Sequence, residues 1–283
     1  MLSALKSSGT NNYPTSHIPL LPEPPTQVSA RLCAVVFDID GVIRDVSRSY
    51  RRALAATVHH YSGWRPDNTH IDALKSEGCW NNDWDASLEL LRRRAHQPLP
   101  EREEVIRIFS GFYFGPEAGE DPGSWTGCIR DEPLLVAAPF FAALSGAGIQ
   151  WGFVSGAEPA SARFVLESRL GLADPPLIAM GDAPDKPDPT GLIRLSRTLI
   201  DRDGGAGTAP RVAYLGDTVA DVLTVQAARR EHPAIDWLSL AVPPPHLNGS
   251  ESERAAYAER LRGAGADRIL TSTTSLLAEL DAL

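Results

Sequence analysis

The sequence predicts an α/β fold in which a parallel sheet is covered by helices on both faces. Short apolar runs recur along the chain, and each ends in a polar group, as residues 32–37 do at Asp38 and Asp40. Runs this short are typical of buried strands in parallel sheets. From residue 136 onward these apolar runs alternate with helical patterns. The alternation indicates a parallel sheet, because parallel strands need right-handed crossover connections. Between residues 45 and 135 the pattern stays helical, so a helical insert is expected after the first strand.

The first predicted strand delivers two aspartates to the edge of the sheet. Its apolar body cannot hold carboxylates, so Asp38 and Asp40 are expected past its carboxyl end, where open α/β sheets bind ligands. Two acids one residue apart, followed by the turn at Gly41, can share a divalent cation and divide nucleophilic and acid/base roles. Taken alone, the same pattern also fits a polar turn whose acids face water.

The insert is expected to form a series of helices. Apolar residues recur on one face of residues 47–61, and the stretch 63–66, with its Gly and Pro, ends that helix. Asp67 can cap the helix that follows. The four helices expected in the insert cover residues 47–61, 67–75, 84–94 and 101–112.

The remainder of the chain alternates strand and helix. Gly171 ends the helix that follows the second strand, and the run of three prolines at 243–245 begins an exposed loop. The expected strands cover residues 149–154, 177–180, 212–215 and 237–242, and the expected helices cover residues 139–146, 157–170, 190–201 and 219–230. Residues 266–283 add a short strand and a closing helix.

Polar groups also follow the later strands. Ser155 and Gly156 follow the second strand, Lys186 comes after the third, and Asp217 and Asp221 follow the fourth. We expect a hydroxyl, an ammonium and four carboxylates to converge at one edge of the sheet. The acids would repel one another without a cation, and Mg²⁺ is expected because it is a hard ion that prefers oxygen ligands. Each group alone also fits an ordinary role, such as a helix cap or a surface lysine.

These four motifs, in this order, resemble those of the haloacid dehalogenase superfamily, in its phosphatase branch. The resemblance covers roughly residues 31–283. It implies a Rossmann-like α/β core made of residues 30–44 and 136–283, with a small α-helical cap domain over residues 45–135. Residues 1–29, rich in Ser, Thr, Asn and Pro, fit a disordered or loosely docked tail.

The resemblance implies a role for each motif residue. Asp38 would attack phosphorus and become an aspartyl phosphate, and Asp40 would protonate the leaving alkoxide and then activate water. The metal ligands would be Asp38, Asp40 through its backbone carbonyl, and Asp217. Asp221 would hold a metal-bound water or orient Lys186.

The phosphate would be held by Ser155, by backbone N–H groups near Gly156 and by Lys186. The second aspartate, Asp40, favours phosphate esters as substrates, because dehalogenases of this superfamily lack it. Members of the β-phosphoglucomutase type carry a His in the first cap helix, where this chain has Tyr50. That difference argues against mutase activity and makes Tyr50 a candidate specificity residue.

The cap is expected to select the substrate. Residues 75–84, which begin with Lys75, lie where related caps place a loop over the active site. Trp80, Asn81 and Trp84 offer flat faces and an amide suited to a sugar or another small polar body. The tryptophans also fit a role in packing the cap.

Arg44 departs from the family pattern, because many phosphatases carry a small residue in this region. A cationic side chain this close to the aspartates is expected either to contact the substrate or to form a salt bridge with the cap.

Composition and charge limit the classes of partner. The chain has 283 residues, a formal net charge of −9 and no long basic stripe, which argues against nucleic acid or an anionic membrane. No apolar run is long enough to span a bilayer, and the first residues lack the apolar core of a signal peptide. Cys33, Cys79 and Cys128 form neither a Cys-x-x-Cys pair nor an even set, which indicates a reducing compartment, and the cytoplasm is expected.

The sequence therefore predicts an Mg²⁺-dependent phosphatase that acts on a small phosphorylated metabolite, such as phosphoglycolate, a sugar phosphate or a polyol phosphate. A phosphomutase is the first alternative. A non-catalytic metabolite-binding protein on the same scaffold is the second. The sequence does not indicate the oligomeric state.

Overall fold

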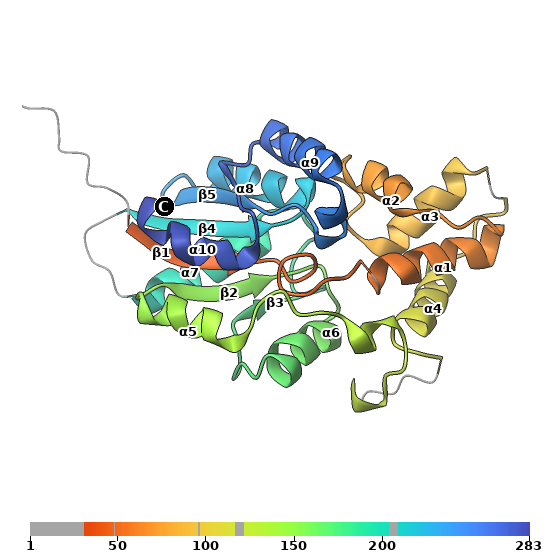
Figure 1. The fold of residues 1–283 in the computed structure, drawn as a ribbon, viewed down its shortest axis with the longest axis horizontal. Helices are drawn as coiled ribbons and strands as arrows, with labels where there is room; N and C mark the ends of the chain where they lie inside the picture. The colour runs from red at the N-terminus through yellow and green to blue at the C-terminus, as the bar shows by residue number, and fades with distance from the viewer. Residues whose placement is uncertain (1–30, 48, 96, 117–121, 204–208) are drawn as a thin grey trace, which may run out of the picture.

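A six-stranded parallel sheet forms the centre of the molecule. The computed structural model describes residues 31–283 except 48, 96, 117–121 and 204–208. The strand order is β3-β2-β1-β4-β5-β6, and every adjacent pair is parallel, as predicted (Figure 1). The strands are β1 (Arg31–Phe37), β2 (Gln150–Val154), β3 (Leu177–Ile178), β4 (Pro210–Gly216), β5 (Asp236–Ala241) and β6 (Arg268–Ile269).

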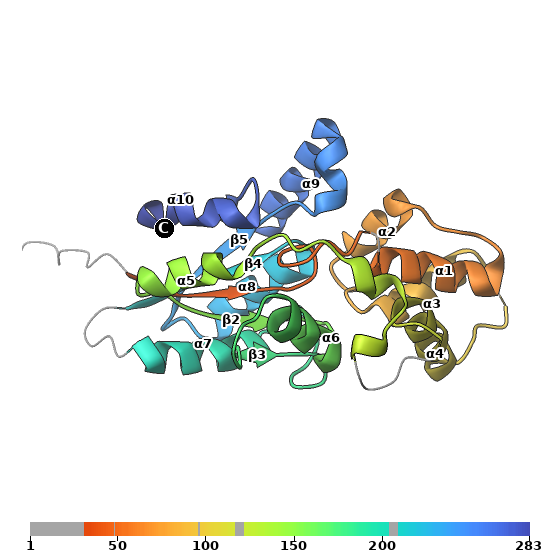
Figure 2. The ribbon, with the colours of Figure 1, turned by 60° about the horizontal axis from the view of Figure 1, so that its bottom comes forward.

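Alternate residues of β1 face opposite layers of helices. Val35 and Phe37 pack into an apolar cluster with α5, α6 and α10, whereas Ala34 and Val36 pack with α7 and α8. Figure 2 shows α5 and α10 on one side of the sheet and α7 on the other. The helices are α5 (Ala138–Gly146), α6 (Pro159–Arg163), α7 (Thr190–Asp203), α8 (Val219–Glu231) and α10 (Leu276–Glu279). A strand buried on both sides explains why the sequence of β1 is a continuous apolar run.

Two predicted elements differ in detail from the structure. The helix expected over residues 157–170 is α6 followed by a π-helical segment at Phe164–Arg169, and Gly171 (φ 71°) follows it. The short β3 covers only the start of the predicted strand at 177–180.

Four helices pack together beyond the carboxyl ends of the strands (Figures 1 and 2). Their shared apolar cluster includes Leu54, Ile71, Leu91 and Phe109. Asp67 caps the second helix as predicted, because its side chain accepts a hydrogen bond from the backbone N–H of His70 at 3.0 Å. The helices are α1 (Tyr50–Ser62), α2 (Asn68–Lys75), α3 (Asp83–Arg93) and α4 (Arg102–Tyr113). The domain boundaries at 45 and 135 stay a prediction, and the predicted tail lies outside the described residues.

The two segments that join these helices to the sheet run side by side. The N–H of Asp45 donates to the carbonyl of Pro133 at 2.8 Å, and the N–H of Leu135 donates to the carbonyl of Ile43 at 2.8 Å. The chain therefore enters and leaves the insert through one hydrogen-bonded pair of segments.

Helix α9 (Glu251–Ala264) is missing from the sequence prediction. Only three of its side chains are buried, and most of the others are charged residues or alanines, so its apolar periodicity is weak. Its ends did carry signals, because Ser250 accepts a hydrogen bond from the N–H of Glu253 and Gly265 (φ 108°) closes the helix. A 3₁₀ turn at Pro245–Gly249 leads into it. No helix among the described residues is long and apolar enough to cross a membrane.

Candidate active site

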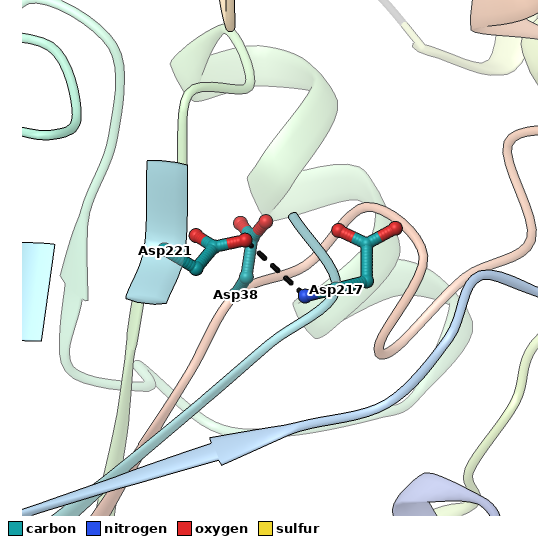
Figure 3. Close-up of side chains that lie close together, drawn as sticks. All are labelled: Asp38, Asp217 and Asp221. Atoms are coloured by element: carbon teal, nitrogen blue, oxygen red, sulfur yellow. Dashed lines mark hydrogen bonds between the residues drawn. The ribbon is translucent and has the colours of Figure 1, made fainter. Parts of the chain in front are cut away.

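Three buried aspartates meet at the carboxyl edge of the sheet. Asp38 follows β1 and Asp217 follows β4, while Asp221 lies in the first turn of α8. Oxygens from the three carboxylates lie within 4.8 Å of one another (Figure 3). The backbone ties the two strand ends together, because the N–H of Asp38 donates to the carbonyl of Leu215 at 2.9 Å.

Gly41 makes this close approach sterically possible. Its φ of +77° suits glycine, and a Cβ atom built on it would lie 1.9 Å from Oδ2 of Asp217. The glycine of the Asp-x-Asp-Gly motif therefore makes room for a carboxylate that is 176 residues further along the sequence.

Lys186 links the aspartates by charge. Its Nζ lies 3.0 Å from Oδ2 of Asp38 and 2.5 Å from Oδ1 of Asp221. It also donates to the hydroxyl of Tyr214 at 3.1 Å. Tyr214 lies within the predicted strand at 212–215, and nothing in an apolar strand shows that a hydroxyl points to a lysine.

Asp221 is fully engaged by donors from the protein. Its Oδ1 accepts from Lys186 and, at 2.9 Å, from the hydroxyl of Tyr214. Its Oδ2 accepts from the N–H of Asp217 at 3.2 Å, drawn in Figure 3, and from the N–H and hydroxyl of Thr218 at 2.9 and 2.6 Å. Five donors use the acceptor capacity of one carboxylate. Of the two expected roles, this geometry favours orienting Lys186.

The crowded carboxylates shift one another's proton affinity. Burial raises the pKa of Asp38 to about 7, and the charge of Lys186 opposes that rise. Burial raises the pKa of Asp217 well above its usual range, and the neighbouring charges of Asp221 and Asp38 add to the rise. Burial also works against ionised Asp221, but the charge of Lys186 and the hydrogen bonds to the carboxylate lower its pKa overall. Three carboxylates thus share the single ammonium of Lys186, and the pKa values of Asp38 and Asp217 stay raised, so a cation beside these two would supply the positive charge that the cluster lacks.

Asp40 is held by a buried arginine. Nε of Arg44 lies 2.6 Å from Oδ1 of Asp40, and Nη1 lies 3.0 Å from Glu132 and 2.9 Å from Oγ of Ser161. The side chain of Arg44 is fully buried, whereas that of Asp40 is 25% exposed. The expectation that Arg44 contacts substrate is corrected. The alternative expectation, a salt bridge to the insert, agrees with the structure, because the buried carboxylate of Glu132 pairs with Arg44.

A cleft of about 860 Å³ lies over this edge. It is lined from the sheet side by Asp38, Asp40, Ser155, Gly156 and Asp217. Lys186 lies beneath and reaches the site through its ion pair with Asp38. The structure therefore brings the four motifs around one cavity.

The insert contributes the opposite wall of the cleft. Tyr50, Lys75, Asn81 and Trp84 line it, and their role as specificity residues stays a prediction. Trp80 does not line it, which corrects the expectation for this residue: its Nε1 donates to Glu77 at 2.9 Å, and its ring borders a separate hollow. Trp80 lies in the loop before α3 and Trp84 lies in the first turn of that helix, and the sequence did not show which tryptophan faces the cleft.

The lining residues that sequence reasoning missed include Arg51, His246 and Tyr257. Arg51 and His246 lie 195 positions apart, yet both contact Asp72, at 2.5 and 2.7 Å. No local pattern indicates this pairing, since it depends on how the insert meets the 3₁₀ turn after β5.

Comparisons with known proteins agree with this geometry. A family model described as a haloacid dehalogenase-like hydrolase matches residues 33–229. A curated relative, imidazoleglycerol-phosphate dehydratase of Phytophthora nicotianae, is 27% identical over an alignment of 251 residues that covers 87% of this chain and 52% of that protein. The chain thus spans about half the length of this relative.

Similar solved structures share the fold at low sequence identity. A hydrolase from Pseudomonas syringae has a TM-score of 0.59 and 17% identity, and covers 89% of this chain and 99% of its own. A hydrolase of the family from Deinococcus radiodurans R1, with bound phosphate and sodium, has a TM-score of 0.57 and 21% identity over 90% and 98%. A phosphonoacetaldehyde hydrolase-like protein from Oleispira antarctica has a TM-score of 0.61 and 13% identity over 89% and 94%. The family expected from the four motifs is confirmed: the chain belongs to the haloacid dehalogenase-like hydrolases.

Proposed function

We propose that this hydrolase is an Mg²⁺-dependent phosphatase that cleaves a small phosphate ester through an aspartyl-phosphate intermediate on Asp38. The observation that carries the proposal is the buried pairing of Lys186 with Asp38 at 3.0 Å, beside Asp217 and at the base of the cleft. A carboxylate nucleophile needs its negative charge offset before an anionic ester can approach it, and this arrangement supplies a fixed ammonium for that purpose.

The donor set fits a magnesium ion. Asp38 and Asp217 are oxygen donors whose pKa values are raised by burial and mutual repulsion, so a divalent cation would favour both ionised forms. We propose that a carboxylate oxygen of each, with the backbone carbonyl of Asp40, holds the ion. When bound, Mg²⁺ would neutralise charge on the phosphate. Asp221 would act beside them by fixing Lys186.

The protein's own groups divide the two half-reactions. In the first, an oxygen of Asp38 bonds to phosphorus while the ester P–O bond breaks and Asp40 gives its proton to the leaving oxygen. In the second, Asp40 takes a proton from water, the water oxygen bonds to phosphorus, and the Asp38–phosphorus bond breaks to release phosphate. Arg44 would hold Asp40 in place, while the Ser155 hydroxyl would donate to a phosphate oxygen.

The shape of the cleft supports a small substrate. Trp84, Asn81 and Tyr50 close over the catalytic edge and leave room for a short polar body such as a sugar, a polyol or a hydroxy acid. The name of the curated relative refers to a phosphorylated compound, which agrees with a phosphate ester as ligand.

The test is phosphate release from an aryl phosphate and a panel of small phosphate esters, with and without Mg²⁺. Wild-type protein should release phosphate only with the metal, and Asp38→Asn should abolish release. The control Asp236→Asn removes a carboxylate at the opposite end of the sheet and should retain full activity. Near-normal Mg²⁺-dependent turnover by the Asp38→Asn protein would refute the nucleophile, and isomerised sugar phosphate without net release would indicate a mutase instead.

A further inference from the structure

Arg51 is held in one orientation on the wall of the cleft. It lies in the first turn of α1, and its side chain is 10% exposed. Nη2 donates to Oδ1 of Asp72 at 2.5 Å, and Nε2 of His246 lies 2.7 Å from the other oxygen of the same carboxylate. Burial works against ionised Asp72, but the His246 hydrogen bond and the Arg51 charge lower its pKa, so the carboxylate remains a fixed anchor for the guanidinium.

The same guanidinium has a nitrogen without a partner. Nη1 of Arg51 is buried and has no hydrogen-bond acceptor among the described residues. Leaving a buried donor unpaired costs about 1–3 kcal/mol, and more for a charged group, so such a nitrogen indicates an acceptor supplied from outside the chain. Arg51 lines the same cleft as Asp38 and Asp217, so its guanidinium lies near the catalytic edge.

The other cation that the insert places along the cleft is already paired. Nζ of Lys75 lies 2.8 Å from Asp83 and donates to the carbonyl of Asn81 at 3.3 Å. These contacts leave Lys75 one N–H of three, whereas Nη1 of Arg51 keeps both of its N–H groups, so among the described residues of this wall Arg51 is better suited to bind two oxygens of a ligand.

We propose that Arg51 binds a second anionic group, a carboxylate or a phosphate, on the leaving part of the substrate. This rests on the proposed phosphatase function and narrows its substrates to small phosphate esters that carry another negative charge. The two N–H groups of Nη1 suit the oxygens of such a group, and charge-assisted hydrogen bonds of this kind are the strong ones. Because α1 carries Arg51 and the 3₁₀ turn after β5 carries His246, the subsite forms only where the insert meets the core.

The experiment compares esters that differ only in this group. Phosphoglycolate is paired with 2-hydroxyethyl phosphate, and 3-phosphoglycerate with glycerol 3-phosphate. Wild-type protein should favour the anionic member of each pair in kcat/KM. Arg51→Met should lower kcat/KM for the anionic member about 10- to 100-fold, and that for the neutral member less than about twofold.

Two variants serve as controls. Arg52→Met removes the same charge one residue along α1, from an exposed position, and should leave the preference unchanged. Arg51→Lys keeps a charge at the site and should retain part of the preference. If Arg51→Met fails to fold, the lysine variant must still show a reduced preference for the anionic member.

The outcomes separate this proposal from the proposed function. An equal loss of kcat/KM for both members of a pair, or no preference in the wild-type protein, would mean that water alone satisfies Nη1 and would overturn the proposed subsite. Mg²⁺-dependent phosphate release from the neutral esters would still support the proposed phosphatase function. Calorimetric titration of phosphoglycolate and 2-hydroxyethyl phosphate into the Asp38→Asn protein with Mg²⁺ measures the same preference without turnover. Equal affinity for the two compounds there would also overturn it.

Discussion

Replacing Lys186 by methionine should destabilise the protein in a way that depends on pH. Lys186 is buried and lies 3.0 Å from Asp38 and 2.5 Å from Asp221. Removing one partner of a buried ion pair costs about 3–5 kcal/mol, because the charge left behind has neither water nor a counterion. At about 2–4 °C per kcal/mol for a domain of this size, the melting temperature should fall by about 6–20 °C.

The pH dependence identifies the cause. Without the ammonium, the raised pKa of Asp38 should rise further, and the pKa of Asp221, which Lys186 now lowers, should rise as well. A carboxyl group whose pKa is raised by folding stabilises the fold below its unfolded value and loses that contribution as pH rises through its folded value. Relative to the wild-type protein, the variant should therefore be most destabilised at pH 8 and progressively less destabilised towards pH 5.

Thermal unfolding followed by circular dichroism, with a chelator present, measures this difference. Lys75→Met is the matched control, because its ion pair with Asp83 is partly exposed, at 14% and 15% of the two side chains, and involves a single carboxylate. The control should lose about 1 kcal/mol or less. If Lys186→Met melts within 1–2 °C of wild type at pH 8, about the change expected of a surface pair, the lysine does not neutralise this cluster.

Two further predictions concern the same edge of the sheet. Gly41→Ala should lower kcat/KM about 100-fold, because the new Cβ would force Asp217 away. The control Gly63→Ala, also at positive φ but in open space, should change kcat/KM little. Equal effects of the two substitutions would contradict the steric argument. Mg²⁺ should raise the melting temperature more at pH 8 than at pH 5. Folding raises the pKa of Asp38 from 3.8 to about 7, so the stability of the metal-free protein falls as pH rises between these values, and at pH 5 protons compete with the metal for this carboxylate. A rise in melting temperature that is independent of pH would mean that the ion binds elsewhere.

The sequence predicted the sheet and its polar edge because both depend on local patterns. An apolar run followed by Asp38 determines a strand and what lies at its end, and parallel pairing then brings Asp217 to the same edge. The roles within the cluster were less accessible. That five donors surround Asp221, or that Tyr214 turns its hydroxyl to Lys186, depends on side-chain directions fixed only by packing.

Contacts between distant segments explain the remaining differences. Arg44 was placed near the site correctly, but its burial follows from Glu132, which no motif marks. Arg51 and His246 both contact Asp72 where the insert meets the 3₁₀ turn after β5, and helical periodicity does not predict which residues meet there. Helix α9 was missed because few of its side chains are buried.

The paired segments at the base of the insert have a consequence for catalysis. Arg44 leads into the insert and Glu132 lies at its exit, and the guanidinium that joins them also grips Asp40. Asp40, the proposed acid/base residue, is thus held by the same arginine that joins the two segments at the base of the insert. With Asp40 in that proposed role, a movement of the insert helices that displaces these segments would also displace the group that transfers the proton. A substitution at Glu132, which lies outside the four motifs, would then change the rate of the chemical step as well as the fit of the substrate.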